Sequence, residues 1–260
     1  MLVDTHAHLD LPEFDKDRDG VIKRAKENGI DYILTIGINL KSCNEAIRLA
    51  GSYDFIYASI GIHPHDTKDI DEDTYKVLKS LAKNRKVLAL GEIGLDFYRN
   101  LSPRDVQVRR FREQINLAWE LSLPIIIHDR DAHKETMDIL KEEGAGNMGG
   151  IIHCFSGDYS MAKRCIDMGF YISIPGTVTF PKAIELQEIV KKLPLSTIFI
   201  ETDCPFLTPV PYRGKRNEPF FVKYVAEKVA SLKGISVEEV AETTSENFGR
   251  LFGNSLLSDS

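Results

Sequence analysis

The sequence lacks the long apolar run that a membrane-spanning helix requires. No stretch of its 260 residues approaches the roughly 18 consecutive apolar residues that cross a bilayer. Its first residues, Met1–His8, also lack the basic start and the apolar core of a signal peptide. We therefore expect a cytoplasmic protein with no membrane contact.

Cysteine is also scarce, with only Cys43, Cys154, Cys165 and Cys204 and no Cys-x-x-Cys pair among them. In a cytoplasmic protein such cysteines are reduced thiols rather than disulfide bridges. Cys154 and Cys204 each follow a candidate metal ligand. Because side chains alternate along a strand, we expect both thiols to point away from the site.

An excess of positive charge is absent as well. The chain carries 33 lysines and arginines against 39 aspartates and glutamates, for a net charge of −6. This balance argues against a protein whose whole surface binds nucleic acid, because non-specific binding depends on the attraction of Lys and Arg to phosphates. It is compatible with a local basic rim around an acidic site. No feature of the sequence indicates an obligate protein partner.

One pattern recurs along the chain: a short apolar run followed by an amphipathic, charged stretch. Short runs rich in Ile, Val, Leu and Tyr are typical of buried parallel strands. The predicted strands are Leu2–Val3, Tyr32–Ile38, Phe55–Ile62, Val87–Leu90, Pro124–Ile127, Gly150–Ile152, Phe170–Ile174 and Thr197–Ile200. The predicted helices are Asp17–Asn28, Ser42–Ser52, Asp71–Lys83, Pro103–Leu121, His133–Glu143, Ser160–Met168, Pro181–Lys192, Phe221–Lys233 and Val237–Phe252.

This alternation predicts an α/β protein with a single (β/α)8 TIM-type barrel and an extra C-terminal helix. The length is close to the ~250 residues typical of such a barrel. We expect one barrel domain over residues 1–252 and a polar tail over residues 253–260.

Five of the predicted strands end on residues that can bind a metal ion. His6 and His8 lie two apart, so both side chains project from the same face of a strand. The other candidates follow predicted strands four, five, six and eight: Glu92, His128, His153 and Asp203. Barrels place their active sites at the carboxyl ends of the strands, and buried polar groups there are costly without partners. The pattern favours a metal site over independently satisfied core residues.

Six ligands exceed what one tetrahedral ion takes, which favours two divalent ions. Glu92 is the expected bridge between them. His6, His8 and Asp203 are expected to hold the first ion, because strands one and eight are neighbours in a closed barrel. His128 and His153 are expected to hold the second. Such a pair of ions supports metal-assisted hydrolysis.

These residues lie in motifs through which the chain closely resembles the TatD family of metal-dependent deoxyribonucleases, within the amidohydrolase-like barrels. The motifs run nearly from end to end: Asp4–Leu9, Gly61–His65, Gly91–Arg99, Pro124–Arg130, His153–Gly157, Glu201–Pro205, Arg213–Asn217 and Asn247–Phe252. The ligand positions of the family correspond to the six residues above. The glutamate at position 92 separates this family from relatives that use a carboxylated lysine there.

The resemblance implies hydrolysis of phosphodiester bonds in DNA, from the 3′ end of a strand, with single-stranded DNA or 3′ ends as the partner. Asp203 and Glu92 are the expected catalytic residues, with Asp203 acting as general base or as ligand only. The expected substrate contacts are His63, His65, Arg99, Arg130, Glu201 and Arg213. Glu201 has a second interpretation, in which it supports a ligand or binds a substrate-associated metal.

Some side chains fit a DNA substrate independently of the family. Arginines such as Arg99, Arg130 and Arg216 suit bidentate phosphate contacts. Tyr98 and Tyr212 beside them suit stacking on bases. Ordinary solvated loop charge is the alternative for each of them.

Two other functions share the same site. One is an amidohydrolase-type hydrolase of a small cyclic amide, ester or phosphoester, and the other is a non-catalytic barrel that retains its metals. The cofactors expected for the enzyme are two divalent ions, Mg²⁺, Mn²⁺ or Zn²⁺. Imidazole favours Zn²⁺ or Mn²⁺, whereas Mg²⁺ prefers oxygen ligands, so we expect a softer ion in the tight sites.

Overall fold

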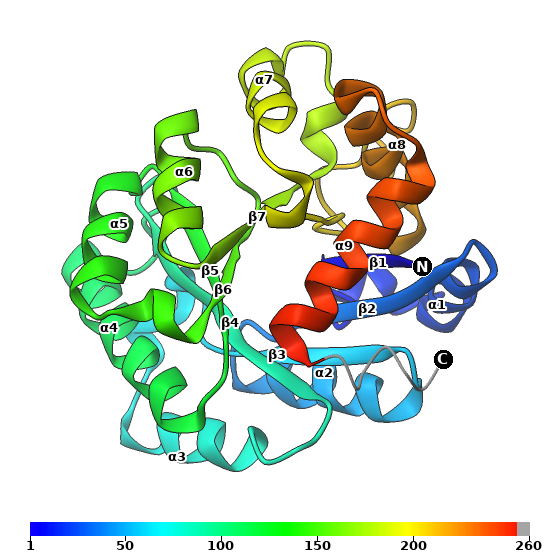
Figure 1. Cartoon of the computed structure of the whole chain (residues 1–260). Helices are drawn as coiled ribbons and strands as arrows, with labels where there is room; N and C mark the ends of the chain where they lie inside the picture. Colours follow the sequence, from blue (N-terminus) through cyan, green and yellow to red (C-terminus); the bar gives the residue numbers. More distant parts are fainter. Residues whose placement is uncertain (254–260) are drawn as a thin grey trace.

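The fold is a TIM barrel, as the sequence predicts. A computed structural model describes residues 1–253. In these residues eight parallel strands lie in the order β1 to β8, each paired with its neighbour in sequence (Figure 1). The strands are β1 (Leu2–Ala7), β2 (Ile30–Ile36), β3 (Ile56–Ile60), β4 (Val87–Asp96), β5 (Ile125–Arg130), β6 (Gly150–Ile152), β7 (Phe170–Ile174) and β8 (Ile198–Ile200).

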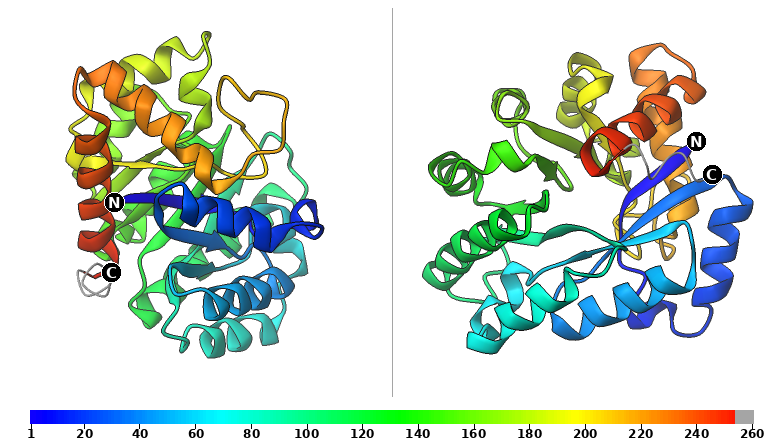
Figure 2. Two further views of the ribbon diagram at one scale, coloured as in Figure 1. Left: turned by 90° about the vertical axis from the view of Figure 1, so that its right-hand side faces the viewer. Right: turned by 60° about the horizontal axis from the view of Figure 1, so that its bottom comes forward.

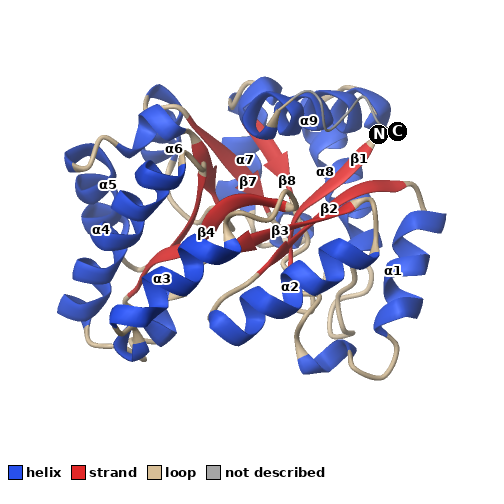
Figure 3. Ribbon diagram, turned by 90° about the horizontal axis from the view of Figure 1, so that it is seen from below, coloured by secondary structure: helices blue, strands red, loops and turns tan. Residues whose placement is uncertain are grey.

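Helices surround the strands on the outside (Figures 1 and 3). They are α1 (Arg18–Glu27), α2 (Leu40–Ser52), α3 (Glu72–Leu81), α4 (Arg104–Leu121), α5 (His133–Glu142), α6 (Tyr159–Asp167), α7 (Ile184–Lys192), α8 (Val222–Lys233) and α9 (Val237–Phe252). Each agrees closely with the amphipathic stretch that predicts it. Gly29 and Gly169, just beyond α1 and α6, have φ of 79° and 97°, a conformation in which glycine suits a helix end.

The interior of the barrel changes character from one end to the other. Alternate residues of a strand face the same side, so Ile126, Ile151 and Phe199 share the inward face with the residues two positions later. Those residues are His128, His153 and Glu201. The apolar members belong to a buried cluster at the amino-terminal end of the strands. The polar members therefore meet at the carboxyl end, where barrels carry their active sites.

Helix α9 closes the amino-terminal end of the barrel. Phe248 of α9 is fully buried and stacks on Tyr32, with ring centroids 5.9 Å apart. Asn247 donates hydrogen bonds to the carbonyl oxygens of Leu195 and Ile198, just before and at the start of β8. Figure 2 shows α9 beside the start of β1. The opposite, carboxyl end of the strands is not covered by α9 and is called the open end below.

The structure shows where two candidate residues lie relative to the ends of their strands, and it describes only the first residue of the predicted tail. β4 continues to Asp96, so Glu92 lies within the strand rather than at its end. β8 ends at Ile200, three residues before Asp203. Of the predicted tail, residues 253–260, only Gly253 is described; residues 254–260 lie outside the described part of the chain. Among residues 1–253 no helix is long and apolar enough to cross a membrane.

Gly94 allows β4 to approach β5 closely beside the site. Its φ is 139°, and a Cβ atom there would lie 2.0 Å from the carbonyl oxygen of His128. We expect Gly94→Ala to destabilise the protein by about 2 to 4 kcal/mol, because it combines strained backbone with overpacking. Urea unfolding followed by circular dichroism measures this change.

Gly51 in α2 is the matched control, because a Cβ there would meet nothing within 4 Å. Gly51→Ala is expected to stabilise the protein by about 0.5 to 1 kcal/mol through higher helix propensity. Equal stability of the two variants would contradict the role given to Gly94.

Candidate metal centre

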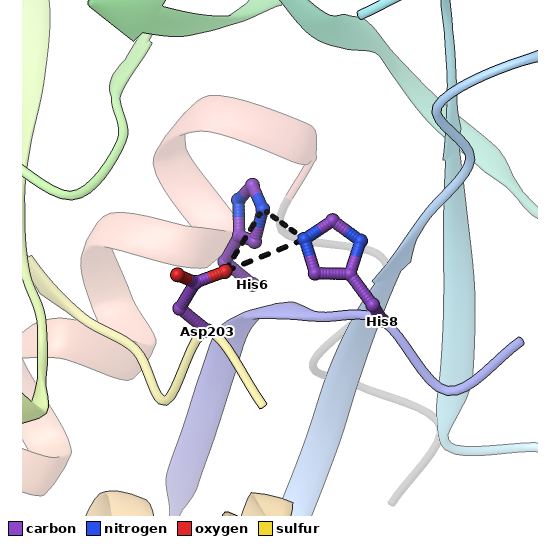
Figure 4. Close-up of side chains that lie close together, drawn as sticks. All are labelled: His6, His8 and Asp203. Atoms are coloured by element: carbon purple, nitrogen blue, oxygen red, sulfur yellow. Dashed lines mark hydrogen bonds and ion pairs between the residues drawn. The ribbon is translucent and has the colours of Figure 1, made fainter. Parts of the chain in front are cut away.

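His6, His8 and Asp203 converge at the open end of the barrel (Figure 4). The Nε2 atoms of the two imidazoles lie 3.3 Å apart. Asp203 Oδ1 lies 3.3 Å from His8 Nε2 and 4.0 Å from His6 Nε2. The backbone N–H of Asp203 donates to the carbonyl oxygen of His6, which fixes the carboxylate beside β1. The neighbourhood of strands one and eight predicted from a closed barrel is therefore present.

Glu92 lies at the centre of the cluster. Its Oε2 atom is 3.3 Å from His6 Nε2 and 3.7 Å from His8 Nε2. Its Oε1 atom is 2.5 Å from His128 Nδ1 and 3.6 Å from His153 Nε2. The two oxygens thus face different groups of imidazoles, which is the arrangement that a bridging carboxylate requires.

His63, which the sequence predicts to contact substrate, lies among the candidate metal ligands. Its Nε2 atom is 3.4 Å from Glu92 Oε1. His63, Glu92 and His128 offer ligand atoms within 4.8 Å of one another, as do His6, His8 and Asp203. The sequence pairs His128 with His153 instead. The structure places His153 against His6, with ring centroids 3.5 Å apart.

Asp96 is a further carboxylate at the edge of the cluster. Its Oδ2 atom lies 2.8 Å from His65 Nε2 and 3.3 Å from His128 Nε2. His65 is thereby held beside the candidate ligands. Six of the seven histidines gather in this region, and only His133 lies apart, where its Nδ1 atom is 2.7 Å from Asp129 Oδ2.

The donor set fits a divalent cation. Ligands about 2.1 Å from a tetrahedral zinc ion lie about 3.4 Å from one another. The closest separations among His6, His8, Glu92 and Asp203 are 3.3 Å. Glu92 is nearly fully buried, and a buried carboxylate beside another needs a compensating positive charge. A cation would supply that charge.

The pKa values show how strongly the carboxylates act on the imidazoles. Burial and the neighbouring His153 lower the pKa of His6 to about 3. Burial alone would also lower the pKa of His8, but Asp203 and Glu92 raise it to about 9. In the metal-free protein, His8 is therefore protonated near neutral pH. A metal ion would displace this proton, since a ligating imidazole must be neutral.

Glu201 supports His153 from behind. Its side chain is fully buried, and Oε1 lies 3.0 Å from His153 Nδ1. It also accepts hydrogen bonds from Ser173 Oγ at 2.6 Å and from the backbone N–H of Cys154 at 2.8 Å. Such burial leaves no surface for a substrate, so the structure favours the supporting interpretation of Glu201 over the substrate contact.

Cys154 lies closer to the site than its sequence position predicts. Its thiol belongs to a group with His153 and Asp203 whose ligand atoms lie within 4.8 Å of one another. The expected orientation away from the site is therefore wrong for Cys154. Strand alternation does not extend to it, because β6 ends at Ile152 and Cys154 has φ of 46°. Burial, with the charges of Asp203 and Glu201, raises the pKa of this thiol well above its usual value.

Exposed arginines lie on the loops and strand ends at the open end of the barrel. Arg99 follows β4, Arg130 ends β5, and Arg213 lies in the loop between β8 and α8. The Arg130 guanidinium lies 4.1 Å from the centre of the Tyr98 ring, and that of Arg213 lies 4.5 Å from the centre of the Phe180 ring.

Two of the side chains expected at this rim have other partners. Arg216 forms ion pairs with Asp17 at 2.8 Å and Glu218 at 3.0 Å. Tyr212 stacks on Phe221, with ring centroids 4.9 Å apart. Neither is therefore as available to a substrate as its sequence position suggests.

The fold and the site thus define a TIM barrel that carries a histidine–carboxylate cluster at the carboxyl end of its strands. Residues 3–253 match the profile of the family described as TatD related DNase, and the chain belongs to that family. The family resemblance of the sequence motifs is thereby confirmed.

Individual relatives cover nearly the whole chain. YabD of Bacillus subtilis, an uncharacterized metal-dependent hydrolase, is 50% identical over 97% of this chain and 99% of its own length. The 3′-5′ ssDNA/RNA exonuclease TatD of Erwinia amylovora is 37% identical over 97% of this chain and 100% of its own. The crystal structure of YjjV, a TatD homologue of Escherichia coli, superposes with a TM-score of 0.90 at 30% identity, over 96% and 97% of the two chains.

Metal binding has a direct thermal consequence. Adding Zn²⁺ or Mn²⁺ to chelator-treated protein at about 100 times the dissociation constant should stabilise it by about 2.7 kcal/mol. For a chain of this size that corresponds to a rise in Tm of roughly 5 to 10 °C. Glu92→Ala should lose the rise, whereas Glu246→Ala, an exposed change on α9, should keep it. A wild-type Tm that no divalent ion moves would argue against the site.

Glu201→Gln tests the support of His153. Loss of the carboxylate should weaken metal binding about 10- to 100-fold, because a neutral amide no longer fixes the imidazole. Titration of the metal-free variant by calorimetry measures the affinity, with the exposed Glu185→Gln of α7 as control. An unchanged affinity would show that Glu201 has no such part.

Proposed function

We propose that this chain is a divalent-metal-dependent hydrolase that removes nucleotides from the 3′ end of single-stranded DNA. The observation that carries the proposal is the central place of Glu92, in contact with imidazoles from several strands, in a chain of the TatD family. Relatives named as 3′-5′ ssDNA/RNA exonucleases support the substrate class. Single-stranded RNA is a second substrate that the same names suggest.

The proposed ligand roles follow the two oxygens of Glu92. His6, His8 and Asp203, beside Oε2 of Glu92, would hold one ion, and His128 and His153, beside Oε1, would hold the other. His63 lies on the Oε1 side as well, where it contacts either the substrate phosphate or the ion. The chemistry that such ions would supply is polarisation of the phosphodiester and a bound water that is nucleophilic near neutral pH.

Asp203 is the proposed general base. Its carboxylate is the more accessible of the two central ones, with a side chain 13% exposed against 4% for Glu92. Proton transfer requires a carboxylate that a water molecule can reach from the open end of the barrel. His65, Arg99, Arg130 and Arg213 are proposed to contact phosphates, since guanidinium groups bind phosphate oxygens in pairs.

A 5′-labelled single-stranded oligonucleotide tests the reaction. Wild-type protein with Mg²⁺, Mn²⁺ or Zn²⁺ should produce a ladder that shortens from the 3′ end, and chelator should stop it. Asp203→Asn should reduce the rate at least about 100-fold, because general bases contribute factors of this size. Asp138→Asn, an exposed change on α5, should leave the rate unchanged.

A circular single strand of the same sequence is the control for direction of attack, because an exonuclease needs an end. Cleavage of the circle would point to an endonuclease instead. No cleavage of any strand by protein that binds metal would overturn the nucleic-acid assignment. Assays with bis-p-nitrophenyl phosphate and dihydroorotate would then separate a phosphoester from a cyclic amide as substrate.

A further inference from the structure

Phe206 is an apolar side chain exposed beside the metal centre. It follows Asp203 by three residues, and 49% of its surface is accessible. Its ring meets the His8 ring edge-on, with centroids 6.2 Å apart and planes inclined by 64°. A single exposed apolar side chain is ordinary on a protein surface. What distinguishes Phe206 is its ring contact with His8, which is a candidate metal ligand.

The backbone holds Phe206 in a fixed relation to Asp203. The N–H of Phe206 donates to the carbonyl oxygen of Asp203 at 2.9 Å. The buried amide of Asn217 donates to the carbonyl oxygen of Phe206 at 2.6 Å and to that of Thr202 at 2.8 Å. Asn217 therefore fixes the segment that carries both the proposed base and the exposed ring.

The opposite end of the cluster also carries an exposed ring. Tyr98 is 60% exposed and follows Asp96, which contacts His65 and His128. One face of Tyr98 is covered by the Arg130 guanidinium. A strand laid across the centre from His8 towards His128 would thus meet an aromatic ring at each end, and arginine near one of them. Grooves that bind single-stranded nucleic acid combine aromatic rings and cations in this way.

We propose that the Phe206 ring stacks on an unpaired nucleobase next to the phosphodiester that is cleaved. This inference rests on the proposed nuclease function and names the part of the substrate that Phe206 recognises. Stacking on a π-face is tolerant of sequence, so Phe206 favours unpaired bases over paired ones without selecting among the four. A flat nucleobase suits the Phe206 ring, and its attached phosphates suit the nearby arginines and the proposed hydrolytic centre.

The experiment combines a side-chain change with a change in the base. Three oligonucleotides differ only at the 3′ end: one carries thymidines, one a terminal dihydrothymidine and one a penultimate dihydrothymidine. Saturation removes the flat π-face and keeps the hydrogen-bonding groups. For wild-type protein, kcat/KM should fall about 5- to 100-fold with one of the two saturated substrates, since stacking contributes this much per base.

Phe206→Ala should lower kcat/KM for the all-thymidine substrate by a similar factor and remove the sensitivity to saturation. Phe206→Tyr should restore both, because it keeps the ring. Trp119→Ala is the matched control: this ring is 39% exposed in the last turn of α4, at the amino-terminal end of the barrel. Its kinetics should equal those of wild type.

The outcomes separate the two proposals. Wild-type protein that cleaves none of the three substrates would overturn the nuclease function, and the stacking role with it. Wild-type protein that cleaves them, beside a Phe206→Ala variant with the same penalty for a saturated base, would overturn the stacking role alone. Circular dichroism and metal-induced Tm shifts of each variant confirm that the fold and the centre are intact.

Discussion

The contact between β1 and the segment after β8 is the constraint on which this barrel and its site depend. β8 ends at Ile200, too early for a full ladder with β1, and a buried carboxylate completes the contact. Asp4 accepts hydrogen bonds from the backbone N–H of Thr202 at 2.9 Å and from its hydroxyl at 2.6 Å. The backbone pairs Asp203 with His6 and Cys204 with His8. The hydrogen bonds that close the barrel between β1 and the segment after β8 therefore also set the positions of His6, His8 and Asp203.

A second constraint is the charge of Glu92 inside the barrel. Burial alone would raise the pKa of Glu92, but the surrounding imidazoles hold it well below its usual value. A carboxylate that stays charged in the interior requires positive partners. The surrounding histidines provide positive charge when they are protonated, or they bind a metal ion that provides it. The buried charge thus explains why the histidines gather around β4.

Rigidity at the open end links the fold to the proposed chemistry. The Asn217 amide holds the segment from Thr202 to Phe206 by two carbonyl oxygens. This segment contributes Asp203, which is both the candidate ligand and the proposed base, and the exposed ring of Phe206. Preorganised groups lose little entropy when a substrate binds, so a loop fixed in this manner suits catalysis. The rim arginines, by contrast, stand exposed on long side chains.

The order of strands and helices could be predicted because each apolar run and each amphipathic stretch is a local signal. Alternation along a strand predicted that His6 and His8 share one face, and the positions after predicted strands five and six indicated His128 and His153. Local patterns end where the strands end, and the failures lie there. Cys154 turns towards the site through a positive φ, and the extent of β4 past Glu92 depends on pairing with β5.

The sequence by itself determined the family, the barrel and the residue types of the candidate metal centre, because motifs and periodicity are properties of the chain alone. Only the tertiary structure decided which side chains meet. It grouped His63 with Glu92 and His128, placed Glu201 behind His153 and exposed Phe206 beside His8. These relations join residues from different strands and loops, and the distances between them are set by barrel closure rather than by spacing in sequence.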